Sequence, residues 1–287
     1  MSHDASTQSQ ALSWINRTYP GLTHAGRSGL TALVADPARS LIALDFDGTL
    51  APIVGDPEQA RALPAAVTAI RELTLLVGTV AVLTGRPALK AVDYASLRQV
   101  PGVVVLGHYG RQRWSDGRLD TPPPPEGLAV AKERLPSVLA AAQAPAGTWI
   151  EDKGEAVAVH TRRAADPAAA LEQLREPLAR LAADTGLRAE PGRLVVELRP
   201  DGSDKGAALT ALVAEGTRSA VLYCGDDVGD LPAFAAIRRL RAEGLPGVAV
   251  CSGSAEVTDI AAECDLVVDG PEGVAGLLSD LANVIRR

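Results

Sequence analysis

The sequence predicts an α/β protein with a parallel sheet sandwiched by helices, into which a smaller α+β unit is inserted. Short apolar runs alternate with helix-length segments in both halves of the chain, and this alternation is typical of a parallel sheet covered on both faces. In the middle, the pattern changes to helices that are each followed by two close strands. Four consecutive prolines at 122–125, which cannot lie inside a regular element, mark the start of this change.

The strands of the parallel sheet are read from continuous apolar runs. The first, Leu41–Leu44, has the pattern of a strand buried on both faces. Further strands are expected at 79–83, 103–106, 220–223, 248–250 and 266–268. Helices are expected between them, among others at 65–77, 206–215 and 231–241. Before the first strand, residues 1–40 predict a polar tail and a helix.

The middle of the chain repeats one pattern twice, a helix followed by two strands. The expected elements are a helix at 128–142, strands at 148–152 and 156–161, a helix at 167–185, and strands at 187–190 and 194–198. Close strands joined by short turns that contain glycine form antiparallel hairpins. We therefore expect a core formed by residues 1–117 and 201–287, with an inserted α+β unit at 118–200.

Composition and charge limit the classes of partner that the protein is expected to bind. Hydrophobic residues make up 47% of the chain, which is enough for a buried core, and the net charge of −7 disfavours nucleic acid and anionic membranes. The odd number of cysteines, three, and the lack of a C-x-x-C pair argue against a disulfide framework or a cysteine zinc site. Without a membrane-length apolar run or a signal peptide pattern, we expect a cytoplasmic monomer that acts on a small molecule.

Acidic residues follow two of the predicted strands. Asp45 and Asp47 come directly after the first strand, and the sequence GDDVGD at 225–230 follows the strand at 220–223. Ligands bind at the carboxyl ends of the strands in open α/β sheets. Clustered carboxylates repel one another unless a cation relieves the repulsion, and Mg²⁺ prefers oxygen ligands. A surface turn would also explain D-x-D-G alone, but the second acidic segment favours a magnesium site.

Two further segments offer groups to a phosphate. Thr84, Gly85 and Arg86 follow the strand at 79–83 and supply a hydroxyl and backbone N–H groups, and Lys205 opens a helix after a capping Asp204. Alone, the first segment is more often a turn into a helix, and a lone lysine is more often a solvated surface residue. The order in which these two segments and the two acidic segments follow one another along the chain favours the phosphate-binding interpretation.

That order resembles the haloacid dehalogenase (HAD) superfamily of phosphotransferases. The resemblance implies a Rossmann-like core in which Asp45 is the nucleophile and Asp47 the general acid/base, while Thr84 and Lys205 hold the phosphoryl group. The implied Mg²⁺ ligands are Asp45, Asp47 and Asp226, supported by Asp227 and Asp230. The chemistry suits these residue types, because a carboxylate attacks phosphorus only where a cation and a lysine neutralise the repelling charge.

Four segments, DFDGTLAPI, EDKG, VELRP and GDDVGDLPAF, resemble the trehalose-6-phosphate phosphatase family over about residues 41–269. By this resemblance the inserted unit is a C2-type cap and the reaction is hydrolysis of trehalose 6-phosphate. The substrate-binding residues it implies are Gly48, Thr49, Gly85, Arg86, Glu151, Lys153 and Glu197. The chain departs from the family at Gly229 and Leu231, and we expect His160 to be a structural strand residue.

Three other functions stay open. One is a phosphatase of the same superfamily for another sugar phosphate, such as sucrose phosphate or a glycosyl-phosphoglycerate. A second is a sugar phosphomutase, which would share the core motifs but return the phosphoryl group to sugar. The third is a catalytically silent partner of a trehalose phosphate synthase, although no residue of the implied machinery is missing.

Overall fold

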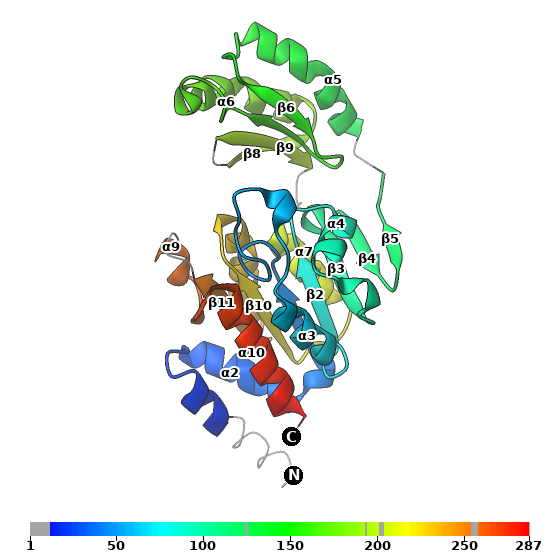
Figure 1. Ribbon diagram of the computed structural model, residues 1–287, viewed down its shortest axis with the longest axis vertical. Helices are drawn as coiled ribbons and strands as arrows, with labels where there is room; N and C mark the ends of the chain where they lie inside the picture. The colour runs from blue at the N-terminus through cyan, green and yellow to red at the C-terminus, as the bar shows by residue number, and fades with distance from the viewer. Residues whose placement is uncertain (1–11, 124–125, 193, 201–203, 254–257, 287) are drawn as a thin grey trace. The chain divides into compact units, whose positions relative to one another are not determined.

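The computed structural model describes residues 12–123, 126–192, 194–200, 204–253 and 258–286 (Figure 1). It divides into two compact units, one formed by Met1–Thr121 and Asp204–Arg287 and the other by Pro122–Ser203. The expected polar tail before residue 12 and the expected domain junction at 200–201 lie wholly or partly outside the described residues.

The first unit is built on a mixed, mostly parallel sheet. Its strand order is β12-β11-β10-β1-β2-β3-β4-β5, and the first six of these strands are parallel. The strands are β1 (Ser40–Leu44), β2 (Thr79–Leu83), β3 (Val103–Gly107), β4 (Gln112–Ser115), β5 (Arg118–Asp120), β10 (Ala220–Gly225), β11 (Gly247–Gly253) and β12 (Leu266–Asp269). The predicted parallel strands are all present, so the predicted fold class is confirmed.

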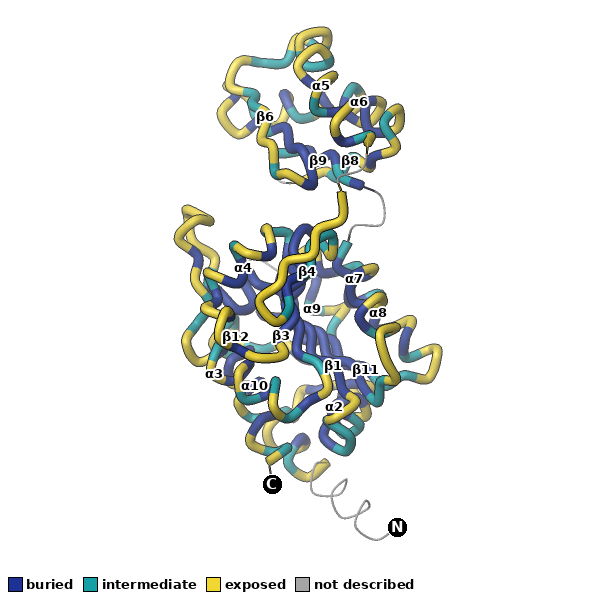
Figure 2. Tube along the Cα trace, turned by 90° about the vertical axis from the view of Figure 1, so that its right-hand side faces the viewer, coloured by how far each residue is buried: buried dark blue, intermediate teal, exposed yellow. Residues whose placement is uncertain are grey.

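Helices cover both faces of this sheet because successive side chains on each strand alternate between them. On β1, Ile42 and Leu44 pack on one side and Leu41 and Ala43 on the other, and all four are fully buried. The buried colour runs along the central strands of the sheet in Figure 2. One face is covered by α2 (His24–Ala35), α3 (Pro64–Leu73), α4 (Ala88–Tyr94) and α10 (Gly270–Ile285). The other is covered by α7 (Lys205–Ala214), α8 (Leu231–Ala242) and the short α9 (Thr258–Ala261).

Short elements complete the first unit. Residues 12–18 are helical, and 3-10 turns lie at Pro37–Arg39, Pro57–Gln59, Leu97–Gln99, His108–Gly110 and Val228–Asp230. The described part of the chain holds no helix that is both long enough and apolar enough to cross a membrane.

The edge of the core sheet differs from the prediction. A turn at Asp116 and Gly117, both with positive φ, joins β4 to β5, and β5 pairs antiparallel with β4. Residues 118–120 therefore belong to the core sheet, and the second unit begins at Pro122 instead of the expected 118. The three residues of β5 are exposed and not predominantly apolar, so the sequence carried no strand signal there.

The second unit is an antiparallel sheet with two helices. Its strand order is β6-β7-β9-β8, formed by β6 (Trp149–Asp152), β7 (Val157–His160), β9 (Val195–Pro200) and β8 (Leu187–Gly192). The helices α5 (Glu126–Ala141) and α6 (Pro167–Asp184) pack on the face that carries Val157, Val159 and Leu198. Alternation places the intervening side chains, among them those of Ala158 and Glu197, on the opposite face.

Candidate active site

The predicted core residues meet at one edge of the first sheet. β1 lies between β10 and β2, and Leu44 pairs with both Cys224 and Val82. The segments that leave these three strands therefore begin at the same level, at the carboxyl ends of the strands. They carry Asp45, Thr84 and Asp226, so parallel pairing brings together residues that are far apart in the sequence.

A buried ion-pair network lies at the centre of this edge. Lys205, at the start of α7, places its Nζ 2.7 Å from Asp45 Oδ1 and 2.7 Å from Asp230 Oδ1. Asp204 caps the helix by accepting a hydrogen bond from Ala207 N, which fixes where Lys205 leaves the backbone. Asp45 and Lys205 are each 4% exposed and Asp230 is fully buried. The network therefore lies in a low-dielectric environment, where charges interact strongly.

Burial and the nearby opposite charge shift the pKa of Asp45, and that of Lys205, in opposite directions. Burial raises the pKa of Asp45 well above its usual range; Lys205 lowers it, and the neighbouring carboxylates raise it further. Burial alone would lower the pKa of Lys205, but Asp230 and Asp45 raise it well above its usual value. Lys205 is therefore a fixed positive charge beside the carboxylate of Asp45.

Both carboxylate oxygens of Asp230 accept hydrogen bonds from protein donors. One carboxylate oxygen accepts hydrogen bonds from Lys205 Nζ at 2.7 Å and Tyr223 Oη at 2.5 Å. The other accepts from the backbone N–H groups of Asp226 at 2.9 Å and Asp227 at 3.1 Å. These bonds fold the loop after β10, in which the exposed Asp227 caps the Val228–Asp230 turn. Asp230 therefore supports the loop after β10.

The carboxylates offer a place for a cation. Ligand atoms of Asp45, Asp226 and Asp230 lie within 4.8 Å of one another. Oδ1 of Asp226 is buried and makes no hydrogen bond within the described chain. Burial, with Asp227 and Asp230 nearby, raises the pKa of Asp226 to about 7. A buried, unpaired carboxylate oxygen is costly, and a hard divalent cation would offset that cost, so the residues present fit Mg²⁺.

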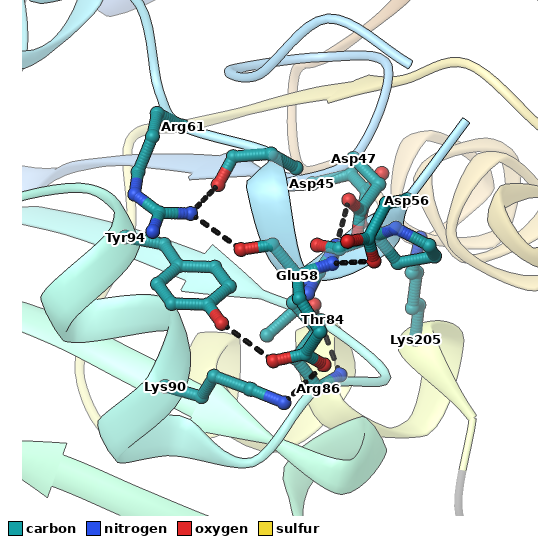
Figure 3. Close-up of polar contacts among 12 residues, drawn as sticks. Asp45, Asp47, Asp56, Glu58, Arg61, Thr84, Arg86, Lys90, Tyr94 and Lys205 are labelled. Atoms are coloured by element: carbon teal, nitrogen blue, oxygen red, sulfur yellow. Dashed lines mark hydrogen bonds and ion pairs between the residues drawn. The ribbon is translucent and has the colours of Figure 1, made fainter. Parts of the chain in front are cut away.

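Asp47 has a different partner from the one expected. Its carboxylate lies in a two-pronged ion pair with Arg86, with Nε to Oδ2 at 2.7 Å and Nη2 to Oδ1 at 2.6 Å (Figure 3). The cluster of three carboxylates thus contains Asp230 in place of Asp47 from the expected metal set. Arg86, expected to bind substrate, donates here to Asp47 and to the carbonyl oxygen of Pro57. Sequence spacing gave no sign of this pair.

Gly48 and Thr49 shape the loop after β1. Gly48 has a φ of +74°, and a Cβ there would lie 1.9 Å from Asp226 Oδ2, so only glycine fits beside the acidic loop. Thr49 is fully buried and its hydroxyl makes no hydrogen bond with the described residues. Ser252, at the end of β11, donates to the carbonyl oxygen of Gly48 at 2.7 Å. The sequence did not predict a role for Ser252, because nothing near it in the chain indicates this contact.

The segment after β2 packs against the 3-10 turn at His108–Gly110. Thr84 is buried, and its hydroxyl oxygen accepts a hydrogen bond from Arg86 N at 3.1 Å. The backbone N–H of Tyr109 donates to Thr84 O, and a Cβ on Gly85 would lie 2.7 Å from the Tyr109 hydroxyl. His108 and Tyr109 both have positive φ, which is strained for residues other than glycine. This strained turn therefore determines the space around Gly85.

The second unit collects the other predicted residues on one face of its sheet. Glu151, Ala158 and Glu197 are paired across β6, β7 and β9, and paired residues share a face. Lys153, just beyond β6, places its Nζ 2.5 Å from Glu197 Oε2. This polar face is opposite the one covered by α5 and α6.

His160 belongs to this face and contacts a predicted residue. Its Nε2 lies 2.7 Å from Glu151 Oε2, and its ring stacks on Trp149 at 4.5 Å between ring centroids. Arg163 lies over the same indole, 4.5 Å from its centroid. The alternating strand pattern placed His160 on the same face as the polar residues, and this was the signal that could have identified the contact.

Comparisons with known proteins agree with this architecture. The family model for trehalose-phosphatase matches residues 43–265. A probable trehalose-phosphate phosphatase of Sinorhizobium fredii is 35% identical over 75% of this chain and 80% of its own length. The trehalose-phosphate phosphatase of Mycobacterium avium is 33% identical over 85% of this chain, which spans 62% of that protein.

Solved structures show the same fold. A trehalose-6-phosphate phosphatase of Aspergillus fumigatus superposes with a TM-score of 0.67 at 22% identity, covering 96% of this chain and 97% of that one. Fold and sequence therefore define the class of protein, a phosphatase. Within it, the chain belongs to the trehalose-phosphatase family.

Proposed function

We propose that the protein hydrolyses trehalose 6-phosphate to trehalose and phosphate, the last step of trehalose synthesis, through a phosphorylated Asp45 and with Mg²⁺. One observation carries the proposal: the carboxylate of Asp45 lies at the carboxyl end of the central strand, 2.7 Å from a buried lysine. A carboxylate held there beside a fixed positive charge is suited to attack phosphorus, which is itself surrounded by negative oxygens.

In the first step an Asp45 oxygen attacks phosphorus and the bond to the sugar oxygen breaks. Lys205 stabilises the charge that develops on the phosphoryl oxygens, and Asp47 protonates the departing sugar oxygen. In the second step Asp47 takes a proton from water, and the water oxygen attacks the phosphorus. Phosphate leaves and the Asp45 carboxylate is restored. Thr84, at the end of β2, contributes to holding the phosphoryl group.

The proposed ligands of Mg²⁺ are Asp45 and Asp226. Asp226 has an unpaired buried oxygen, whereas both oxygens of Asp230 are already bonded to protein donors. Asp47 was expected to be a third Mg²⁺ ligand. Its carboxylate is instead paired with Arg86, so we do not include its side chain among the ligands. When bound, Mg²⁺ would neutralise charge on the phosphoryl oxygens.

Family membership and the second unit support the choice of sugar. Glu151, Lys153 and Glu197 provide acceptors and a donor suited to the hydroxyl groups of an uncharged sugar. These side chains share one polar face of the sheet. We propose that residues 118–200, less the three that form β5, act as the substrate-recognition cap, and that the protein works as a monomer.

The test is phosphate release from trehalose 6-phosphate, measured beside sucrose 6-phosphate and glucose 6-phosphate. We expect release that is selective for trehalose 6-phosphate, stops in EDTA and returns when excess Mg²⁺ is added. Release from another sugar phosphate alone would contradict the proposed substrate and keep the mechanism. Transfer of phosphate between sugar positions without release would indicate a mutase, and no turnover of any substrate would indicate a silent partner.

A further inference from the structure

Three donor contacts fix the guanidinium of Arg86. Nε and Nη2 bind the two oxygens of Asp47, and Nη2 also donates to the carbonyl oxygen of Pro57 at 2.8 Å. The Arg86 side chain is only 12% exposed, and the hydrogen bonds with Asp47 raise its pKa, so it stays charged. A planar two-pronged pair fixes direction as well as distance. The position of the Asp47 carboxylate therefore depends on what holds Arg86.

The ring of Tyr94, at the end of α4, lies beside Arg86. The guanidinium carbon of Arg86 is 5.4 Å from the Tyr94 ring centroid, and that of Arg61 is 4.0 Å from it. The Tyr94 hydroxyl donates to Glu58 Oε2 at 2.7 Å, and Lys90 binds the other oxygen of Glu58 (Figure 3). Tyr94 thus links Arg86 to the turn at Pro57–Gln59.

This turn is itself fixed by charged contacts. Asp56 accepts a hydrogen bond from Glu58 N at 3.0 Å, which caps the turn. Arg61 donates to the carbonyl oxygens of Glu58 at 2.8 Å and Ala60 at 2.7 Å. Because the Asp56 side chain caps the turn and Arg61 holds the carbonyl oxygens that follow Pro57, the turn presents Pro57 O to the guanidinium in one orientation.

We propose that Tyr94 and the turn at Pro57–Gln59 position Arg86, and that Arg86 in turn positions Asp47 for proton transfer. The inference rests on the proposed function, since it assigns Asp47 the proton that the sugar oxygen receives. Arg86 is then a positioning residue, in contrast to the phosphate contact that the family resemblance implied. Each Asp47 oxygen uses one acceptor position for Arg86 and keeps another with which to hold or give up a proton.

Positioning predicts a specific kinetic pattern. Substrate affinity depends on other groups, so loosening Arg86 should lower kcat and leave KM nearly unchanged. A small displacement of a catalytic group costs up to about a hundredfold in rate. A direct contact between Arg86 and the phosphate would instead raise KM.

The experiment compares Tyr94→Leu, Arg86→Gln and the double variant, using steady-state kinetics at saturating Mg²⁺. We expect Tyr94→Leu to lower kcat about tenfold with KM within about twofold of the wild type. In the Arg86→Gln background, Tyr94→Leu should have no further effect, because its route to Asp47 is already lost. Tyr94→Phe keeps the ring beside Arg86 but loses the hydrogen bond to Glu58, so its kcat should lie between those of Tyr94→Leu and the wild type.

Asp93→Asn is the matched control. Asp93 lies one residue before Tyr94 on α4 and pairs with Arg98 at 2.5 Å on the surface, with no contact to Arg86. Thermal unfolding of every variant identifies those whose fold is damaged; for these, Glu58→Gln replaces Tyr94→Leu in the cycle. Additive effects of the two substitutions, a change confined to KM, or Tyr94→Leu kinetics equal to those of Asp93→Asn would each overturn the inference.

The same cycle is run with glycerol 3-phosphate as a second substrate, because its departing alkyl oxygen needs a proton as a sugar oxygen does. If trehalose 6-phosphate is not hydrolysed but this alkyl ester is, the proposed substrate fails. Coupling between Tyr94 and Arg86 measured with the alkyl ester would then still support the positioning role, and its absence would overturn it.

Discussion

The two units hold their charged side chains in opposite ways. In the first unit, Asp45 and Lys205 are each 4% exposed and Asp230 is fully buried, and each is bonded to another member of the network. In the second unit, the side chain of Glu151 is 48% exposed and that of Lys153 is 32% exposed, while that of Glu197 is 15% exposed. The same residue types therefore stand in environments of very different dielectric.

The difference corresponds to two kinds of work. Buried charges cannot rearrange cheaply, since removing one partner leaves the other unpaired in a low dielectric. Such a network would keep the proposed nucleophile, Asp45, in one geometry. Exposed pairs contribute only about 0–1 kcal/mol, so their groups exchange partners readily. We infer that Glu151 can exchange its contact with His160, and Lys153 and Glu197 their contact with each other, for sugar hydroxyls.

The largest effect is expected from Asp45→Asn. The amide is not a nucleophile, so phosphate release should fall at least about a thousandfold while substrate still binds. The fold should persist, because the change removes one of several crowded carboxylates and leaves Lys205 paired with Asp230. Phosphate assays and thermal unfolding check both points. Full activity in this variant would rule out Asp45 as the nucleophile.

The next largest effect is expected from Lys205→Met. Without the lysine, the buried carboxylates of Asp45 and Asp230 lose their counter-charge, which should lower the free energy of unfolding by about 3–5 kcal/mol. Tyr223→Phe removes only a neutral donor to Asp230 and should cost about 1–3 kcal/mol. Urea unfolding measures both variants. Equal unfolding midpoints for Lys205→Met and the wild type would show that the network contributes nothing to stability.

The sequence predicts the central strands of the core better than it predicts the loop contacts and the edge of the sheet. The continuous apolar run at 41–44 predicted β1, and motif order predicted which acidic segments meet at its end. By contrast, the pair of Asp47 with Arg86 and the contact of Ser252 with Gly48 depend on side-chain direction in loops, which no periodicity encodes. The hairpin at β4 and β5 was missed for a similar reason, since an exposed edge strand needs no apolar pattern.

A smaller effect is expected in the second unit. Lys153→Met and Glu197→Gln should each raise KM for trehalose 6-phosphate about tenfold, because the first removes a donor to a sugar hydroxyl and the second replaces a charged acceptor by a neutral amide. Stability should fall by about 1–3 kcal/mol, because the side chain of Glu197 is only 15% exposed and loses its charged partner.

Asp152→Asn is the control for both variants. Asp152 neighbours Lys153, but its side chain pairs with Lys132 at 2.6 Å and lies on the other face of β6. A rise in KM for Asp152→Asn that matched those of Lys153→Met and Glu197→Gln would mean that local charge, and not one face of the sheet, determines recognition.

The smallest effect is expected at His160, where two substitutions separate its two contacts. His160→Phe keeps a ring stacked on Trp149 but removes the bond to Glu151, whereas His160→Gln keeps a donor and loses the ring. If His160 serves to orient Glu151, the Phe variant should raise KM about threefold and the Gln variant should remain near the wild type. Steady-state kinetics with trehalose 6-phosphate measure the difference. The reverse order would assign recognition to the stacked rings, and the polar face would then bind sugar through an aromatic surface as well as through its charged pairs.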